Sequence, residues 1–339
     1  MPRKPEAQSA EPASPSTRTI TADRGDANVR LDLVLCRRLA DVPRLTRTRV
    51  QAWIEEGRVL MNGMPVHRAS TRPSSGSEIS VLLPSDVSGP RTPVSAEPAD
   101  LEIIFEDEDL LVINKPAGVV MHPTYRHSDG TIMNALMWHA RGWPEGSRPS
   151  LVQRLDKLTS GVVVVAKTSA VHRTLQRSLV SGRGEKDYLA VVYGRISPAR
   201  GAIDLRLARD RKDRRRVVAS ATHGVVSLTN YERLAHVKAP STGLSLVRCR
   251  LLTGRMHQIR VHLSAAGWPI VGDPAYGQPK WREVADLQLA SRLREFPRQA
   301  LHAWRLAFTH PADQRRMQFE APLPEDFQAL LTATGLDLA

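Results

Sequence analysis

The sequence is poor in cysteine, in aromatic residues and in long apolar runs. Its 339 residues include two cysteines, Cys36 and Cys249, so neither a disulfide framework nor a thiolate metal site is indicated. No apolar run approaches the roughly 20 residues that a membrane-spanning helix needs. The N-terminus lacks the apolar core of a signal peptide. These absences predict a cytoplasmic protein without a membrane partner.

Motifs that bind cofactors are also missing. The sequence has no Gly-rich phosphate loop of either nucleotide-binding type, and it has no Gly-x-Ser-x-Gly motif. The histidines show no ligand spacing tied to an acidic partner; those considered are His122, His257, His262 and His302. We therefore expect no cofactor, neither a metal nor a nucleotide.

Positive charge is what the chain has in excess. It contains 48 lysines and arginines against 35 acidic residues, a formal net charge of +13. Arginine forks match phosphate geometry and counterion release drives binding to polyanions, so this charge favours a nucleic-acid partner. A solvated basic surface is the alternative. Aromatic residues are only 5% of the chain, which argues against a platform that stacks many successive bases.

The length suggests about two domains, and composition places their boundaries. Residues 1–27 are expected to be a disordered tail, residues 28–84 a small domain, residues 85–100 a Pro-rich linker and residues 101–330 a larger domain. We expect a cytoplasmic monomer.

The small domain has clear local signals. Apolar spacing predicts a helix over residues 29–40, and Thr46 can cap a second helix that Gly57 ends. Asn62-Gly63 predicts a tight hairpin, and residues 78–83 predict a further strand. Two short helices followed by strands resemble the S4-type RNA-binding module. Its candidate RNA contacts are Arg44, Arg47 and Arg49. The alternative is any small αβ domain.

The larger domain mixes strands and helices without an internal repeat, which suggests an α+β fold with a large mixed sheet. Strands are predicted over residues 101–105, 110–113, 162–166, 187–193 and 244–252. Helices are predicted over residues 131–139, 170–179 and 256–266.

The most informative segment is Arg154 to Gly161, Arg-Leu-Asp-Lys-Leu-Thr-Ser-Gly. It runs straight into Val162-Val163-Val164-Val165-Ala166, a β-branched run typical of a strand buried on both faces. This placement puts Asp156 at the rim of the core between two cations, which keep a carboxylate ionised. The alternative is a polar loop with an ordinary ion pair.

Three further segments accompany this one in order. They are Val112 to Gly118 (Val-Ile-Asn-Lys-Pro-Ala-Gly), Glu185 to Tyr188 (Glu-Lys-Asp-Tyr) and Thr253 to Leu263 (Thr-Gly-Arg-Met-His-Gln-Ile-Arg-Val-His-Leu). Together with Ala300 to Ala303, they resemble the RluA family of RNA pseudouridine synthases over residues 101 to about 327. The likeness is greatest to the branch that modifies large-subunit ribosomal RNA. It implies a largely antiparallel central sheet with flanking helices, and isomerisation of uridine to pseudouridine in RNA.

The resemblance also implies roles for individual residues. Asp156 matches the essential aspartate, which either attacks covalently or takes a sugar proton. Tyr188 matches the tyrosine that stacks on the uracil and is proposed to remove the C5 proton, and Arg260 matches the basic partner of the aspartate. Arg154 matches the arginine that fills the space left by the flipped nucleotide. Gln153 stands where the family usually has histidine, so any role for a charge there is lost.

Other arginines are expected to contact RNA phosphates. Arg255 can do so or can form a structural ion pair. The run Arg209 to Arg216 holds six cations and two anions, and its candidate contacts are Arg214, Arg215 and Arg216.

We therefore expect a pseudouridine synthase whose partner is 23S ribosomal RNA or the assembling large ribosomal subunit. A transfer-RNA substrate and a non-catalytic ribosome-assembly factor remain the alternatives.

Overall fold

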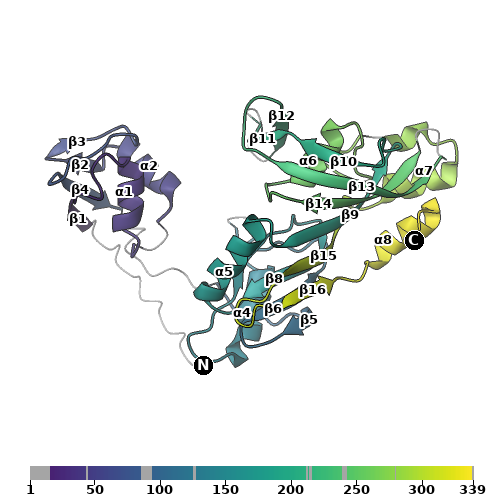
Figure 1. Cartoon of the computed structure of the whole chain (residues 1–339), viewed down its shortest axis with the longest axis horizontal. Helices are drawn as coiled ribbons and strands as arrows, with labels where there is room; N and C mark the ends of the chain where they lie inside the picture. Colours follow the sequence, from purple (N-terminus) through teal and green to yellow (C-terminus); the bar gives the residue numbers. More distant parts are fainter. Residues whose placement is uncertain are drawn as a thin grey trace, which may run out of the picture. The chain divides into compact units, whose positions relative to one another are not determined.

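The computed structural model of the chain divides into two units, residues 1–93 and residues 94–339. Most of their elements are labelled in Figure 1. The structure describes residues 16–42, 45–84, 94–124, 127–210, 213, 216–238, 243–278 and 280–337. Among these residues no helix is both long and apolar enough to cross a membrane.

The first unit packs two helices on a four-stranded sheet of order β1-β4-β2-β3. Its elements are β1 (Ser16–Thr21), α1 (Leu31–Arg38), α2 (Arg47–Glu55), β2 (Val59–Met61), β3 (Met64–Pro65) and β4 (Glu78–Leu83). The hydroxyl of Thr46 accepts from the N–H of Arg49, which caps α2. Asn62 and Gly63 both have positive φ, 52° and 78°, as the predicted tight turn between β2 and β3 requires.

The start of this unit corrects the expected tail. Residues 16–21 pair with β4 along their whole length. Threonine recurs at every second position, at Thr17, Thr19 and Thr21, and β-branched residues suit a strand. Asp26 is fully buried and accepts hydrogen bonds from Arg37 and Arg38 of α1. The expected boundary at residue 27 is therefore too late. Residues 1–15 lie outside the described part of the chain.

The end of the expected linker belongs to the second unit. Val94 packs on the core of that unit. The buried amide of Asn134 donates to the carbonyl of Ser95 (2.9 Å) and to the carboxylate of Glu97 (3.0 Å). Residues 94–97 are therefore anchored to the second unit, and residues 85–93 lie outside the described residues.

The second unit is built on a ten-stranded mixed sheet (Figure 1). Its main path is β10-β13-β14-β9-β15-β8-β6-β5, while β16 pairs with β15 and β7 with β8. Of the described pairs, only β15 with β8 is parallel, so the predicted α+β fold with a largely antiparallel sheet is confirmed. The strands are β5 (Glu102–Glu106), β6 (Leu110–Lys115), β7 (Ser150–Leu151), β8 (Ser160–Ala166), β9 (Glu185–Tyr193), β10 (Arg200–Asp204), β13 (Leu228–Val237), β14 (Leu244–Leu251), β15 (Leu301–Thr309) and β16 (Arg316–Glu320).

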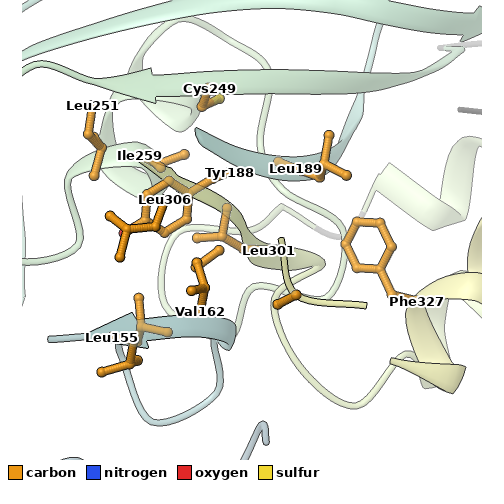
Figure 2. Close-up of a cluster of buried hydrophobic side chains, with 14 of the residues drawn as sticks. Leu155, Val162, Tyr188, Leu189, Cys249, Leu251, Ile259, Leu301, Leu306 and Phe327 are labelled. Atoms are coloured by element: carbon orange, nitrogen blue, oxygen red, sulfur yellow. The ribbon is translucent and has the colours of Figure 1, made fainter. Parts of the chain in front are cut away.

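Helices flank this sheet, and a separate hairpin completes the unit. The helices are α4 (Ile132–His139), α5 (Ser169–Val180), α6 (Gln258–Ala265), α7 (Leu287–Glu295) and α8 (Glu325–Thr334), with short 3-10 turns at Ala140–Gly142 and Lys280–Glu283. The hairpin pairs β11 (Arg206–Arg209) with β12 (Val217–Ser220). Every residue of β8 is buried, as its valine run predicts. Figure 2 shows part of the core, in which Leu155, Tyr188, Ile259 and Leu301 come from different elements.

Candidate active site

The loop that carries Asp156 is held at several points of its backbone. The side-chain nitrogen of the fully buried Lys115 donates to the carbonyl of Lys157 (3.2 Å), and the N–H of Gly118 donates to the same oxygen (2.8 Å). From a segment much later in the sequence, Arg298 donates to the carbonyl of Leu158 (3.3 Å). These bonds fix the loop where it enters β8.

The loop ends at Gly161, where backbone conformation and packing both require glycine. Its φ of +118° is one that side chains rarely adopt. A Cβ placed there would lie 2.2 Å from the carbonyl oxygen of Ala303 on β15. The glycine therefore lets β8 approach β15 at the base of the site.

Asp156 is joined to a second carboxylate through Arg260. Arg260, on α6, donates one hydrogen bond to Asp156 (2.8 Å) and two to Asp273 (2.7 and 2.8 Å). Asp273 is buried and also accepts from the backbone N–H groups of Ala275 and Tyr276. A guanidinium held in this bidentate way keeps a fixed orientation toward Asp156.

Asp273 and Arg260 stabilise each other's charged forms. Burial alone would raise the pKa of Asp273, but the hydrogen bonds and charge of Arg260 bring it below its ordinary value. Burial alone would lower the pKa of Arg260, and its two carboxylate partners raise it above the ordinary value. Asp273 is thus an anion and Arg260 a cation at neutral pH, and the cation faces Asp156.

His257 lies beside the same carboxylate. Its Nε2 is 3.9 Å from Asp156, and its Nδ1 is 2.8 Å from the hydroxyl of Tyr276. Burial is the main cause that lowers the pKa of His257 below its ordinary value. The imidazole is therefore neutral at neutral pH, and Arg260 is the cation in direct contact with Asp156.

Tyr188 is in the core and at the pocket at the same time. It is on β9, is 8% exposed and lies within the apolar cluster that includes Leu155, Ile259 and Leu301 (Figure 2). Burial and the charge of Asp156 raise the pKa of its hydroxyl above the ordinary value. The phenol is therefore neutral at neutral pH. It can remove a proton only if it passes its own proton on.

A pocket of about 720 Å³ brings the three predicted catalytic residues together, because Asp156, Tyr188 and Arg260 all line it. Arg154 and Arg255 line it as well, and both are exposed. No hydrogen bond or ion pair joins the Arg154 side chain to a described residue. Burial and the charge of Arg154 lower the pKa of His122, another lining residue.

Gln153 also lines the pocket. Its amide nitrogen donates to the carbonyl of Val162 (3.1 Å). Its buried amide oxygen has no hydrogen-bond partner among the described residues.

The other predicted RNA contacts have structural partners or lie outside the described residues. Arg47 pairs with the buried Asp32 (2.9 Å), and the guanidinium of Arg49 lies 5.9 Å from the centre of the Trp53 ring. Arg216 donates to the carbonyl of Ala275 (2.7 Å) and remains exposed. The predictions for Arg44, Arg214 and Arg215 fall outside the described part of the chain. In the parts that the structure covers, no group of three or more His, Cys, Asp or Glu could hold a metal ion.

Sequence reasoning missed several supporting residues. Asp273 lies between Gly272 and Pro274, and this local sequence predicts only a turn. Lys115 lies in one of the recognisable motifs, but nothing local indicates that it is fully buried. Arg298 is 3% exposed and is held by two hydrogen bonds to Asp326. Only tertiary packing brings these residues to the loop and to Arg260.

Comparisons with known proteins identify the family of the chain. Residues 109–265 match the family model described as RNA pseudouridylate synthase. The chain is 39% identical over 315 residues to "Uncharacterized RNA pseudouridine synthase YlyB" of Bacillus subtilis, covering 92% of this chain and 96% of that protein. It is 41% identical over 296 residues to "Ribosomal large subunit pseudouridine synthase D" of Pseudomonas aeruginosa, covering 87% of this chain and 89% of that protein.

Solved structures give the same likeness. "Human RNA Pseudouridylate Synthase Domain Containing 1" has 29% sequence identity and a TM-score of 0.52, over 70% of this chain and 90% of that one. "Human RNA Pseudouridylate Synthase Domain Containing 4" has 25% identity and a TM-score of 0.55, over 69% and 92%.

Proposed function

Because this chain belongs to the RluA family of RNA pseudouridine synthases, we propose that it converts uridine to pseudouridine in large-subunit ribosomal RNA, with Asp156 as the essential carboxylate. The chain is an RNA pseudouridine synthase, and relatives named for the large ribosomal subunit support this choice of substrate. The observation that carries the catalytic assignment is Asp156, the one carboxylate among the described residues that line the pocket, which lies 2.8 Å from a buried arginine and shares the pocket with a buried tyrosine.

The chemistry follows from this arrangement. The bond from uracil N1 to ribose C1′ breaks, the base turns within the pocket, C5 bonds to C1′, and the proton on C5 leaves while N1 gains one. Asp156 acts on the sugar, either as a nucleophile at C1′ or as a base for a sugar proton. Arg260 donates a hydrogen bond to this carboxylate and so holds its orientation.

Tyr188 contributes at the later proton transfer. Its ring supplies a flat apolar surface for the uracil, and its neutral hydroxyl can accept the C5 proton as it releases its own. The target base has to leave the RNA stack to reach these groups, and Arg154 is the exposed cation that fills the vacated space. The first unit, with its S4-like arrangement, adds RNA affinity.

The test is Asp156→Asn, which removes the charge and keeps the shape. Single-turnover conversion of a large-subunit RNA fragment should fall at least about a thousandfold, while RNA affinity stays within about twofold. Glu145→Gln is the matched control, since Glu145 is exposed and outside the pocket lining. A rate near wild type in Asp156→Asn would contradict the catalytic assignment. Mapping pseudouridines in cells with and without the gene tests the choice of RNA.

A further inference from the structure

The pocket has a large excess of positive charge. Asp156 is the only carboxylate among the described residues that line it, and Arg260 already engages this group. Four further cations line the same pocket, and they are Arg154, Lys157, Lys186 and Arg255. A pocket of this composition accepts an anionic ligand, and the phosphates of RNA are such anions.

Lys186 occupies a special place among these cations. It lies two residues before Tyr188 on β9, and side chains two apart on a strand point to the same face. Both line the pocket. The strand rises about 7 Å over two residues, so the ammonium group is within reach of a phosphate whose base lies on Tyr188. A base and its own phosphate are separated by a single sugar.

The neighbouring acidic residues cannot neutralise Lys186, because other arginines hold them. Asp187 points to the opposite face and accepts two hydrogen bonds from Arg250, both 2.7 Å. Glu185 pairs with Arg250 (2.8 Å) and with Arg316 (2.5 Å). The side chain of Lys186 forms no hydrogen bond or ion pair with any residue that the structure describes.

We propose that Lys186 binds a backbone phosphate adjacent to the target uridine and thereby fixes the base on Tyr188. The exposed Arg255 is the second cation at this position. The Lys186 ammonium lies beside Gly254, the residue that precedes Arg255: a Cβ added to Gly254 would be 3.7 Å from the Lys186 Nζ. This inference rests on the proposed function, since it assumes that an RNA uridine enters the pocket.

The free protein carries an electrostatic cost at this position. Lys186 is half-buried, and burial together with the charge of Arg255 lowers its pKa below the ordinary value. A bound phosphate offsets both effects, because it supplies the missing counter-charge and hydrogen-bond acceptors. The site is therefore complete only with the RNA backbone in place.

The experiment is a double-mutant cycle between the protein and the RNA. Its probe is an RNA stem-loop that the wild-type enzyme converts, with a neutral methylphosphonate at the phosphate 5′ or 3′ of the target uridine. Lys186→Met should weaken binding of the unmodified RNA about tenfold or more. The methylphosphonate at one of the two positions should weaken wild-type binding similarly. The two changes together should cost little more than either alone.

Two further variants sharpen the test. Lys186→Arg should retain most of the affinity, because it keeps the charge. Lys238→Met should bind like wild type, since Lys238 is exposed and outside the pocket lining. The proposal is overturned if Lys186→Met binds the RNA as tightly as wild type does. It is also overturned if, at each of the two methylphosphonate positions, the loss of affinity from Lys186→Met simply multiplies with the loss from the methylphosphonate. Failure of the proposed function is distinguishable, because the wild-type chain would then convert no stem-loop taken from large-subunit ribosomal RNA.

Discussion

Tyr188 has to satisfy two demands with one side chain, since it packs in the core and faces the reacting base. Its ring belongs to the apolar cluster of Figure 2, while its hydroxyl forms no hydrogen bond with a described residue. The raised pKa keeps that hydroxyl neutral, so its catalytic value lies in moving a proton rather than in carrying a charge. Packing and chemistry at this residue can therefore be separated.

Replacing Tyr188 with Phe makes this separation. We expect the single-turnover rate of pseudouridine formation to fall about a hundredfold or more, because the group that takes the C5 proton is gone. RNA affinity and the free energy of unfolding should change little, because the ring remains. Tyr193→Phe is the control: Tyr193 is 2% exposed on the same strand and does not line the pocket. Equal rates in both variants would mean that Tyr188 serves only packing.

The sequence identified some residues of the site better than others. Asp156 and Tyr188 stand in motifs that were recognisable before any fold was known, and the pocket contains both. Asp273 was not recognisable, because its local sequence predicts a turn and its role depends on Arg260 of another segment. Residues that hold other residues leave a weaker local signal than residues that meet the substrate.

At the scale of elements, the local sequence patterns predicted those helices, turns and strands whose formation depends on local interactions. The capping threonine, the Asn-Gly turn and the valine run correspond to α2, the β2–β3 hairpin and β8. The order of strands was not predictable in this way. β15 lies between β9 and β8, which both precede it by more than a hundred residues, and this pairing depends on long-range burial.

The parallel contact of β8 and β15 contains a buried histidine. His302 donates from Nε2 to the carbonyl of Ala321 (3.2 Å), so its Nδ1 accepts from the hydroxyl of Ser160 (2.9 Å). Burial lowers the pKa of His302 to about 4. The folded state therefore prefers the neutral ring, whereas the unfolded chain takes up a proton near its ordinary pKa of 6.5.

This difference predicts how stability depends on pH. The contribution of His302 is fully present above pH 6.5 and is lost as the pH falls toward 4, because the unfolded state binds the additional proton. The loss should reach about 3 kcal/mol at most. Urea unfolding of the second unit at pH 7 and pH 4.5, followed by tryptophan fluorescence, measures it. His302→Gln should have a lower free energy of unfolding than wild type at pH 7, but that free energy should fall less between pH 7 and pH 4.5. An equal loss in both proteins would contradict the assignment.

At the scale of the whole molecule, the two units have separate cores and separate tasks in the proposed function. Removing residues 1–93 should leave a folded enzyme that binds RNA more weakly. Each RNA phosphate that the first unit neutralises makes the slope of log K against log salt more negative by about 0.7–0.9, so the slope of the truncated chain should be less steep. Single-turnover conversion at saturating enzyme should persist. An inactive but folded truncation would mean that the first unit helps to build the active site.

The position of the cut matters, because composition and structure disagree about where the second unit begins. Removing residues 1–100, as the Pro-rich composition suggests, also removes Val94 from the core and the acceptors of the buried Asn134 amide nitrogen. An unsatisfied buried amide costs about 1–3 kcal/mol, so this shorter chain should unfold at lower urea concentration than the chain that begins at Val94. Equal midpoints for the two truncations would place the boundary at residue 101, as the composition alone indicates.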